Sequence, residues 1–264
     1  NKDVNILTRC QNNEMTMDTH FQVSRDSVKG AVELRGNGEL IKRAALDDIG
    51  GWNNYTITDD LDMSTRLHIK GWDVRFCPDT IVYEEGIMYL FPLYRQRRRW
   101  LEGTIRRYLE YFGDILTSKK MSLRVRLDMI AYISEFIMPA WFIIEIGILL
   151  MKIIIKDAPP HILMSSIIMG AIIGLGFMIA CRYSLRRYDN LSRRDAFFQA
   201  IETSIYLLIW FPLVLFIGTK ILFMKKDMNW GKTAHGLVQH EHAIQKAKEK
   251  IRQAKEELKK LLKK

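Results

Sequence analysis

The chain has 264 residues, 48% of them hydrophobic, and a formal net charge of +10. The basic residues cluster beside apolar stretches, as the positive-inside rule predicts for membrane proteins, so we expect membrane lipid and not nucleic acid as the anionic partner. Its cysteines, Cys10, Cys77 and Cys181, are odd in number and far apart, which argues against a disulfide framework or a zinc site and fits a reducing cytosolic face.

The first third of the chain has the pattern of mixed helices and strands. Residues 5–25 indicate a mostly polar helix, and residues 31–35 alternate like a short strand. Gly36-Asn37-Gly38 then signals a turn, and a helix is predicted over residues 39–49.

An acidic run, Thr58-Asp59-Asp60-Leu61-Asp62, begins a helix predicted over residues 61–70, and two strands are predicted at 72–77 and 79–83. Carboxylates favour a helix N-terminus because its N–H groups are unpaired, but capping needs only one of the three. Asp60-Leu61-Asp62 could also bind a metal ion. The polar residues 53–58 argue against that reading, because such a site ends an apolar central strand.

A second motif, Gln96-x-x-Arg99-Trp100, lies on a helix predicted from Pro92 to about Phe112. At about 100° per residue, the helix has an apolar stripe opposite the motif face. The stripe consists of Tyr94, Leu101, Ile105, Tyr108 and Phe112, and the motif face also holds Gly103 and Arg107. Arg97 and Arg98 flank the stripe, where long side chains can reach lipid phosphates. We therefore expect this helix to lie on a membrane.

Residues 129–151 and 162–181 are each long and apolar enough to cross a bilayer. Their basic flanks put both outer ends in the cytosol and the Pro159-Pro160 turn outside. The third apolar stretch, 201–224, is predicted to break at Pro212 and Gly218 into a hairpin with both ends inside.

Four charged residues lie in or beside these apolar stretches. Glu135 and Glu145 are deep enough to be paired or to line a polar path. Glu202 and Lys220 lie near the ends, where an interhelical salt bridge or snorkelling is preferred.

After residue 236 the chain is rich in Ala, Lys, Glu and Leu with a 3-4 spacing of apolar residues over 244–261. This pattern leaves three alternatives: a short coiled coil, a docking helix, and a basic helix on anionic lipid.

The order and separation of Thr58-Asp59-Asp60 and Gln96-x-x-Arg99-Trp100 resemble motifs of membrane-integrated, inverting family 2 glycosyltransferases. Cellulose, hyaluronan, chitin and poly-N-acetylglucosamine synthases belong to this group. The resemblance implies an α/β fold, namely the C-terminal half of a GT-A domain. It implies an acceptor-side half over 1–87, interface helices over 88–127, transmembrane helices over 128–224, and a cytosolic element with the heptad helix over 225–264.

The resemblance also implies roles for the motif residues. Asp60 would be the catalytic base, with Asp59 where Glu is commoner. Trp100 would stack on the acceptor sugar, and Gln96 and Arg99 would serve the donor pyrophosphate and the catalytic loop. The resemblance further implies that Asn37 and Gly38 lie in a small-residue loop near the acceptor. Lys232 and Thr233 would form a lid on the donor side.

The implied activity is inverting, processive extension of a β-linked polysaccharide from a UDP-sugar, with transfer of the polymer across the inner or plasma membrane. A Mg or Mn ion would be held by an Asp-x-Asp in a nucleotide-binding half expected before residue 1, so no metal ligand is assigned here and a partner chain could carry that half. Two alternatives stay open: a non-catalytic membrane scaffold fragment, and a non-processive transferase that glycosylates a lipid.

Overall fold

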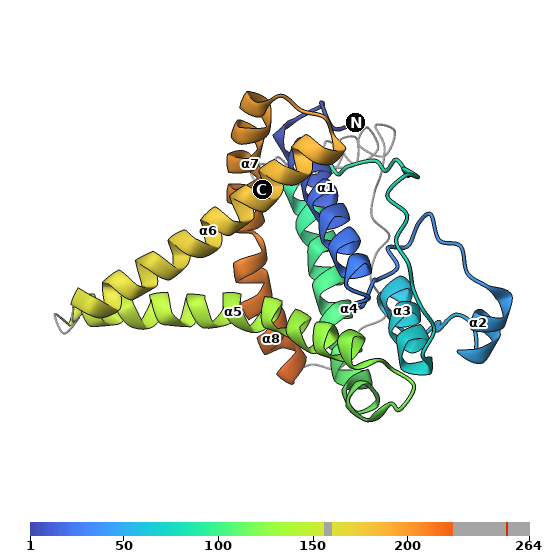
Figure 1. Ribbon diagram of the computed structural model, residues 1–264. Coiled ribbons are helices and arrows are strands. Elements are labelled where there is room, and N and C mark those ends of the chain that lie inside the picture. Colours follow the sequence, from blue (N-terminus) through green and yellow to red (C-terminus); the bar gives the residue numbers. More distant parts are fainter. Residues whose placement is uncertain (156–159, 224–251, 253–264) are drawn as a thin grey trace, which may run out of the picture.

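The computed structural model describes residues 1–155, 160–223 and Arg252 (Figure 1). The helices of this described part follow one another in the order α1 (Ile6–Ser27), α2 (Arg43–Asp48), α3 (Asp59–Lys70), α4 (Leu90–Thr117), α5 (Leu123–Ile154), α6 (Pro160–Tyr188), α7 (Arg193–Leu207) and α8 (Trp210–Phe223). The predicted heptad helix, Lys232 and Thr233 lie outside the described residues.

The described residues contain no β-strand, so the expected α/β fold is wrong for this part of the chain. Side chains, not a neighbouring strand, bind the backbone of the first predicted strand. The Ala31 N–H donates to Asp128 at 2.7 Å, the Glu33 N–H donates to the side chain of Gln22 at 3.1 Å, and the Val32 carbonyl lies 2.7 Å from His68 Nε2.

The alternating pattern over residues 72–77 reflects burial on one side of irregular backbone, whereas three successive residues of the first predicted strand, Ala31, Val32 and Glu33, are all buried. Val32 and Val74 pack with Met63 and Leu67 of α3 in one apolar cluster, which Leu34, Trp72 and Phe76 border. A strand and a one-sided irregular segment bury every second residue alike, but only a strand needs a partner ladder.

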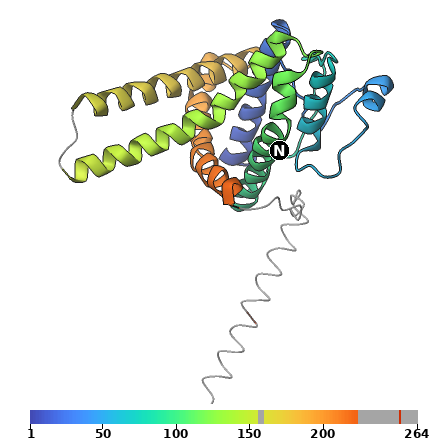
Figure 2. The same cartoon turned by 90° about the horizontal axis from the view of Figure 1, so that it is seen from below.

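The predicted motif helix is confirmed as α4, but its apolar stripe is covered by other helices. Leu101 packs against Leu213, Val214 and Ile217 of α8, and Tyr108 packs against Met129 of α5. Figures 1 and 2 show α4 in the middle of the described molecule, between α1, α3 and α8. Helix α4 therefore joins the motif-bearing front of the chain to its apolar helices.

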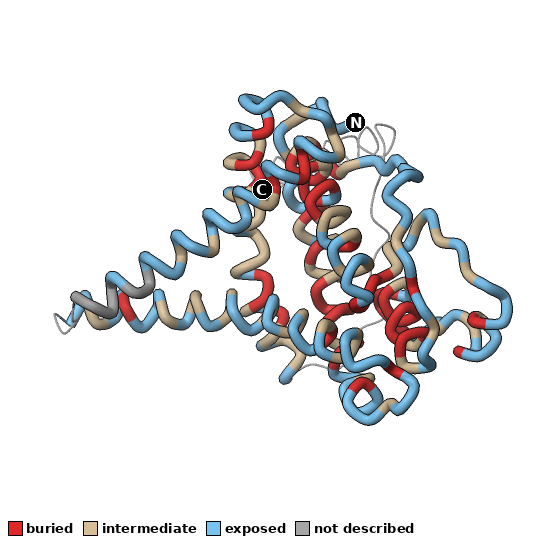
Figure 3. The backbone as a smooth tube through the Cα atoms, in the orientation of Figure 1, coloured by how far each residue is buried: buried red, intermediate tan, exposed pale blue. Residues whose placement is uncertain are grey.

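In the part of the chain that the structure describes, three helical segments are long and apolar enough to cross a membrane: Leu123–Ile154, Ile167–Tyr188 and Arg193–Phe223. Only 6%, 11% and 17% of their most apolar windows are buried, so their outer faces suit contact with lipid. Helices α5 and α6 project together from the other helices, and their exposed lengths are pale blue in Figure 3.

The third apolar segment is interrupted at Leu208 and Ile209, between α7 and α8. Pro212 explains the interruption, because its ring excludes the usual hydrogen bond to the carbonyl of Leu208. The predicted hairpin is wrong, since α8 continues in the direction of α7 and Gly218 lies inside α8 (Figure 1).

Two ion pairs tie the apolar segments to the front of the chain. Arg9 of α1 bonds Glu202 at 2.9 Å, and Lys220 bonds Glu102 of α4 at 2.6 Å. The preference for salt bridges at Glu202 and Lys220 is confirmed.

Candidate active site

Asp60 lies in the first turn of α3, which begins after Thr58 and ends at Gly71 in the left-handed conformation (φ 83°). One carboxylate oxygen of Asp60 accepts the Leu61 N–H at 2.8 Å. Burial raises the pKa of the Asp60 carboxyl; the Leu61 N–H opposes this rise and the charge of Asp59 adds to it. A carboxylate with a raised pKa is the better proton acceptor, as a general base requires.

Asp62 is occupied elsewhere. Its two oxygens bind Arg66 at 2.7 Å and the Tyr111 hydroxyl at 2.8 Å, and its side chain is buried. Asp60 and Asp62 therefore do not combine as a metal-binding pair. Within residues 1–155 and 160–223, no group of three or more His, Cys, Asp or Glu side chains is placed to hold a metal ion.

The loop after the first predicted strand packs on Asp60. Gly36 has a φ of 79°, and a Cβ atom there would lie 3.3 Å from a carboxylate oxygen of Asp60. Gly38 has a φ of 60° and leaves room for Val82. The side chain of Asn37 donates to Glu84. Glycine is thus needed at both ends of this turn, which brings backbone to the predicted base.

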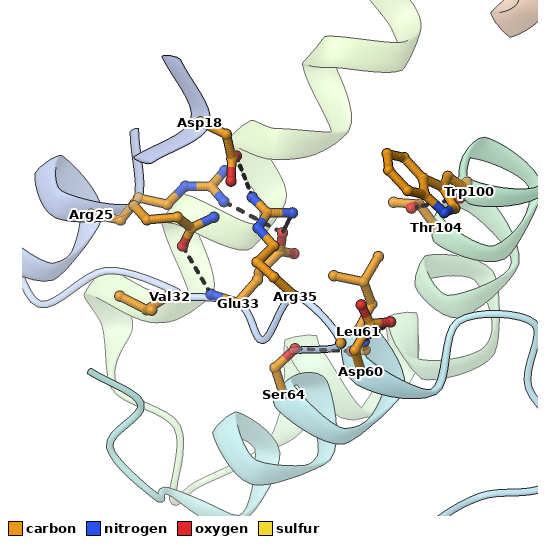
Figure 4. A network of polar contacts seen from close by, with 12 residues as sticks. Asp18, Arg25, Val32, Glu33, Arg35, Asp60, Leu61, Ser64, Trp100 and Thr104 are labelled. Carbon is orange, nitrogen blue, oxygen red and sulfur yellow. Dashed lines mark hydrogen bonds and ion pairs between the residues drawn. The ribbon is translucent and has the colours of Figure 1, made fainter. Parts of the chain in front are cut away.

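Helix α4 brings the second motif to the first. Gly103 leaves room for Thr58, whose methyl carbon would lie 2.5 Å from a Cβ at that position. One turn further on, Arg107 donates to the Leu61 carbonyl at 3.2 Å. As a result Trp100 lies across from Asp60 (Figure 4). Burial lowers the pKa of Arg99 while the charges of Asp60 and Asp59 oppose that effect, in line with its place beside them.

A buried ionic network lies next to these motifs (Figure 4). Its centre is Glu33, 5% exposed, which faces Arg107 at 2.9 Å and Arg25 and Arg35 at 3.7 Å each. Burial alone would raise the pKa of Glu33, but the three guanidinium groups lower it to about 2. Arg35 also pairs with Asp18. Because Arg35 directly precedes Gly36, the network holds the start of the loop that contacts Asp60.

Sequence reasoning missed this network and a second one around Arg97. Arg97 was expected at lipid phosphates, yet it is 1% exposed and bonds Glu14 at 2.5 Å, so that expectation is wrong. The one feature of the sequence that pointed to either network was the position of Arg107 on the motif face of the helix. The partners of both arginines come from remote parts of the sequence and leave no local pattern.

Seven of the nine predicted site residues border one cleft of about 2990 Å³: Asn37, Gly38, Asp59, Asp60, Gln96, Arg99 and Trp100. The same cleft continues between the apolar helices, where its lining includes Phe142 of α5, Ile173 and Phe177 of α6, Leu207 of α7 and Phe211 of α8. Glu135 of α5 also borders it. The structure thus joins a polar end, which holds both motifs, to an apolar end.

Residues 1–155 match the family described as glycosyl transferase family group 2. The chain is 33% identical over 245 residues to the beta-monoglucosyldiacylglycerol synthase of Trichormus variabilis, an alignment that covers 89% of this chain and 50% of that protein. For the synthase of the same description from Synechocystis sp. the identity is 34% over 245 residues, with 89% and 49% covered. The probable glucomannan 4-beta-mannosyltransferase 11 of Oryza sativa is 33% identical over 121 residues, with 44% and 21% covered. The chain spans about half the length of the two synthases.

Proposed function

The chain belongs to glycosyl transferase family group 2, and on this premise we propose that it forms the acceptor side of an enzyme that transfers one hexose, such as glucose, from a UDP-sugar to a hydroxyl group of a membrane glycerolipid. The observation that carries the proposal is the cleft, which runs from Asp60 and Trp100 to a space between apolar helices. The name of the two synthases, beta-monoglucosyldiacylglycerol synthase, supports a diacylglycerol acceptor.

The size and lining of the cleft fit a lipid acceptor. Pockets for drug-sized ligands occupy about 300–1,000 Å³, so a cleft of about 2990 Å³ has room for a sugar donor together with a lipid. Acyl chains can lie among Phe142, Phe177 and Phe211, while the glycerol hydroxyl reaches the polar end. An apolar lining lets these chains pass from the bilayer into the cleft without contact with water, which would cost roughly 0.8 kcal/mol for each methylene group exposed.

The residues at the polar end can perform the transfer. Asp60 takes the proton of the acceptor hydroxyl as its oxygen forms a bond to the anomeric carbon of the donor. The bond from that carbon to the phosphate oxygen breaks in the same step, and the nucleoside diphosphate leaves with the electron pair. Arg99 can stabilise the diphosphate, and attack from the opposite side inverts the anomeric configuration.

The divalent ion stays a prediction. No group of described carboxylates is placed to hold a metal ion. Asp62, the nearest candidate to Asp60 in sequence on α3, is already bonded to Arg66 and Tyr111.

A lipid product is favoured over the processive polysaccharide that the motifs first suggested. The inner lining of this cleft is mainly aromatic and aliphatic, as a site for acyl chains requires, and the two synthases of similar sequence are named for a lipid product. The three apolar segments would then hold the enzyme in the membrane as a multi-pass protein, with the cleft open to the cytosol.

The test is the identity of the product. The whole protein in nanodiscs is incubated with radiolabelled UDP-glucose and dioleoylglycerol, and the organic extract is analysed by thin-layer chromatography and mass spectrometry. We expect label in a lipid that carries one hexose. Asp60→Asn should abolish this product, whereas Asp114→Asn, at an exposed carboxylate near the end of α4, should not. Label in an insoluble polymer would overturn the proposal, and no transfer at all would favour the scaffold alternative.

A further inference from the structure

A buried polar cluster lies directly behind Trp100. It contains Glu14 of α1, Arg97 of α4, Tyr206 of α7 and Trp210 of α8. The Glu14 carboxylate accepts hydrogen bonds from Arg97 at 2.5 Å, from the Tyr206 hydroxyl at 3.0 Å and from Trp210 Nε1 at 3.0 Å. Four helices therefore meet at one carboxylate, which fixes the position of the Arg97 guanidinium.

Arg97 also contacts two residues of the second motif. Its guanidinium carbon lies 4.1 Å from the centre of the Trp100 ring, and one of its nitrogens donates to the Gln96 side chain at 3.2 Å. A guanidinium stacked on an indole is attracted to the ring face and restricts its tilt. The orientation of Trp100 and Gln96 therefore depends on Arg97. Since both residues border the cleft, this orientation determines what they present to it.

The cluster connects this motif to the membrane helices. Tyr206 and Trp210 flank the interruption at Leu208 and Ile209. The positions of their side chains therefore depend on how α7 and α8 are placed relative to each other. The Tyr206 hydroxyl also accepts a hydrogen bond from Arg97 at 3.3 Å. A shift of either helix would move Arg97 and, with it, the ring of Trp100.

We propose that Arg97 is a positioning residue for the acceptor: held by Glu14, Tyr206 and Trp210, it sets the orientation of Trp100 and Gln96 and couples α7 and α8 to the acceptor end of the cleft. The proposal rests on the proposed function in one respect, that Trp100 meets the acceptor. A purely structural ion pair between Arg97 and Glu14 would give the same burial without affecting acceptor recognition.

Arg97→Lys separates these roles. Lysine keeps a positive charge for Glu14 but lacks the planar group that stacks on Trp100. We expect the KM for the acceptor to rise roughly three- to tenfold, as loss of a stacked cation implies, and the KM for the donor, which Gln96 is predicted to serve, to rise less. The matched control is Arg95→Lys, an exposed position on the same helix, which should change neither constant. Equal increases in both KM values would overturn the proposal.

A double-mutant cycle tests whether Arg97 acts through Trp100. In a Trp100→Leu background, Arg97→Lys should change the acceptor KM by less than twofold; the same increase as in the parent would overturn the proposal. The cycle is measured with whichever acceptor the protein uses, so a polymer product would contradict the proposed function and leave this inference standing.

Two further measurements keep the test valid if Arg97→Lys is unstable or the protein is inactive. Tyr206→Phe removes one hydroxyl of the cluster and should raise the acceptor KM in the same direction, whereas Tyr183→Phe, exposed on α6, should not. The fluorescence of Trp100, isolated as the difference between the parent and Trp100→Leu, should shift in Tyr206→Phe and in Arg97→Lys. An unshifted emission in both variants would overturn the inference without any assay of transfer.

Discussion

The Asp60 carboxyl combines a raised pKa with a place at a helix N-terminus. Burial causes the rise, and Asp59 adds to it through like-charge repulsion. Transfer needs the ionised form, so kcat/KM should fall as the pH falls through this raised pKa. Asp59→Asn removes a negative neighbour, which favours ionisation of Asp60 and should move the acidic limb of the pH–rate profile to lower pH. Asp114→Asn, at an exposed position near the end of α4, should leave the limb in place, and an unmoved limb in Asp59→Asn would contradict the coupling.

Glu33 determines a second pH dependence, that of stability. Its folded-state pKa is about 2 against an ordinary value of 4.5, so its ionised form stabilises the fold above about pH 4.5 and this contribution is lost as the pH falls towards 2. The difference corresponds to about 3 kcal/mol. Glu33→Gln should lower the thermal midpoint at pH 7, because three arginines lose their common partner.

The measurement for Glu33 is thermal unfolding in detergent across that pH range. The gap between the parent and Glu33→Gln should narrow as the pH falls from about 4.5 to 2. Glu85→Gln, at an exposed position, serves as the control and should unfold like the parent at every pH. A gap that stays constant with pH would mean that Glu33 is not ionised in the folded protein.

For single residues, the parts of the site that could be predicted are those that belong to short sequence motifs. Asp60, Arg99 and Trp100 belong to short motifs with fixed spacing, and the structure brings them to one cleft. Arg97 belongs to the same motif, yet its partners Glu14 and Tyr206 lie 83 residues before it and 109 residues after it in sequence. Amphipathic periodicity places a residue on a face of a helix but does not identify what covers that face.

At the scale of elements, the contact between α4 and the start of α3 depends on one glycine. A Cβ atom at Gly103 would lie 2.5 Å from a carbon of the Thr58 side chain, too close for this side chain and the backbone of α4 both to remain in place. Gly103→Ala should therefore move the second motif away from Asp60, reduce kcat/KM by at least tenfold and lower the thermal midpoint. Thr58→Ala in the same chain frees the space and should restore much of the stability.

Helix α4 offers its own control for that substitution. Gly113 lies in the same helix, and a Cβ there would meet nothing within 4 Å. Gly113→Ala should raise the stability by roughly 0.5–1 kcal/mol, because alanine is the better helix former. If Gly103→Ala behaved like Gly113→Ala, the close approach of the two motifs would not be needed.

Helix α6 provides the matching test of the apolar end of the cleft. Gly174 borders the cleft, and a Cβ there would meet nothing within 4 Å, so Gly174→Leu should narrow the space without a clash. Transfer to long-chain diacylglycerol should fall more than transfer to dioctanoylglycerol, measured as a ratio of kcat/KM values. Gly147→Leu, on α5 and also without neighbours within 4 Å, should leave the ratio unchanged. An unchanged ratio in Gly174→Leu would mean that the acyl chains do not lie in this part of the cleft.

Elements were predicted well where the sequence has helical periodicity and poorly where it alternates. Helices α3 and α4 and the apolar helices were expected near their observed positions, since caps and long apolar runs are local signals. The strand expected over residues 31–35 failed because its backbone binds Gln22 and Asp128 instead of a neighbouring strand. Pro212 was correctly taken as a helix breaker, but one proline does not determine whether the next helix turns back.

For the whole molecule, α4 is the link between two kinds of surface. Its motif face borders the polar end of the cleft, and its apolar face packs on α5 and α8, whose outer surfaces are exposed and apolar. If α5 and α6 cross the membrane as proposed, we expect the cleft to open on one side of it only. Basic residues at the start of α5 and the end of α6, including Arg124 and Arg187, favour the cytosol for that side.

Cysteine labelling tests this orientation, since Cys77 is exposed while Cys10 and Cys181 are buried. A membrane-impermeant maleimide should label Cys77 in inside-out vesicles and not in right-side-out vesicles. Ile155→Cys, at the far end of α5 and 67% exposed, should show the reverse, because about 30 Å of bilayer separates the two ends. The labelling of Cys77→Ser measures the signal from all other thiols, which is subtracted from the signal of the parent. Labelling of both sites from one side would mean that α5 does not cross the membrane, and the acyl chains of the proposed acceptor would need another route to Asp60.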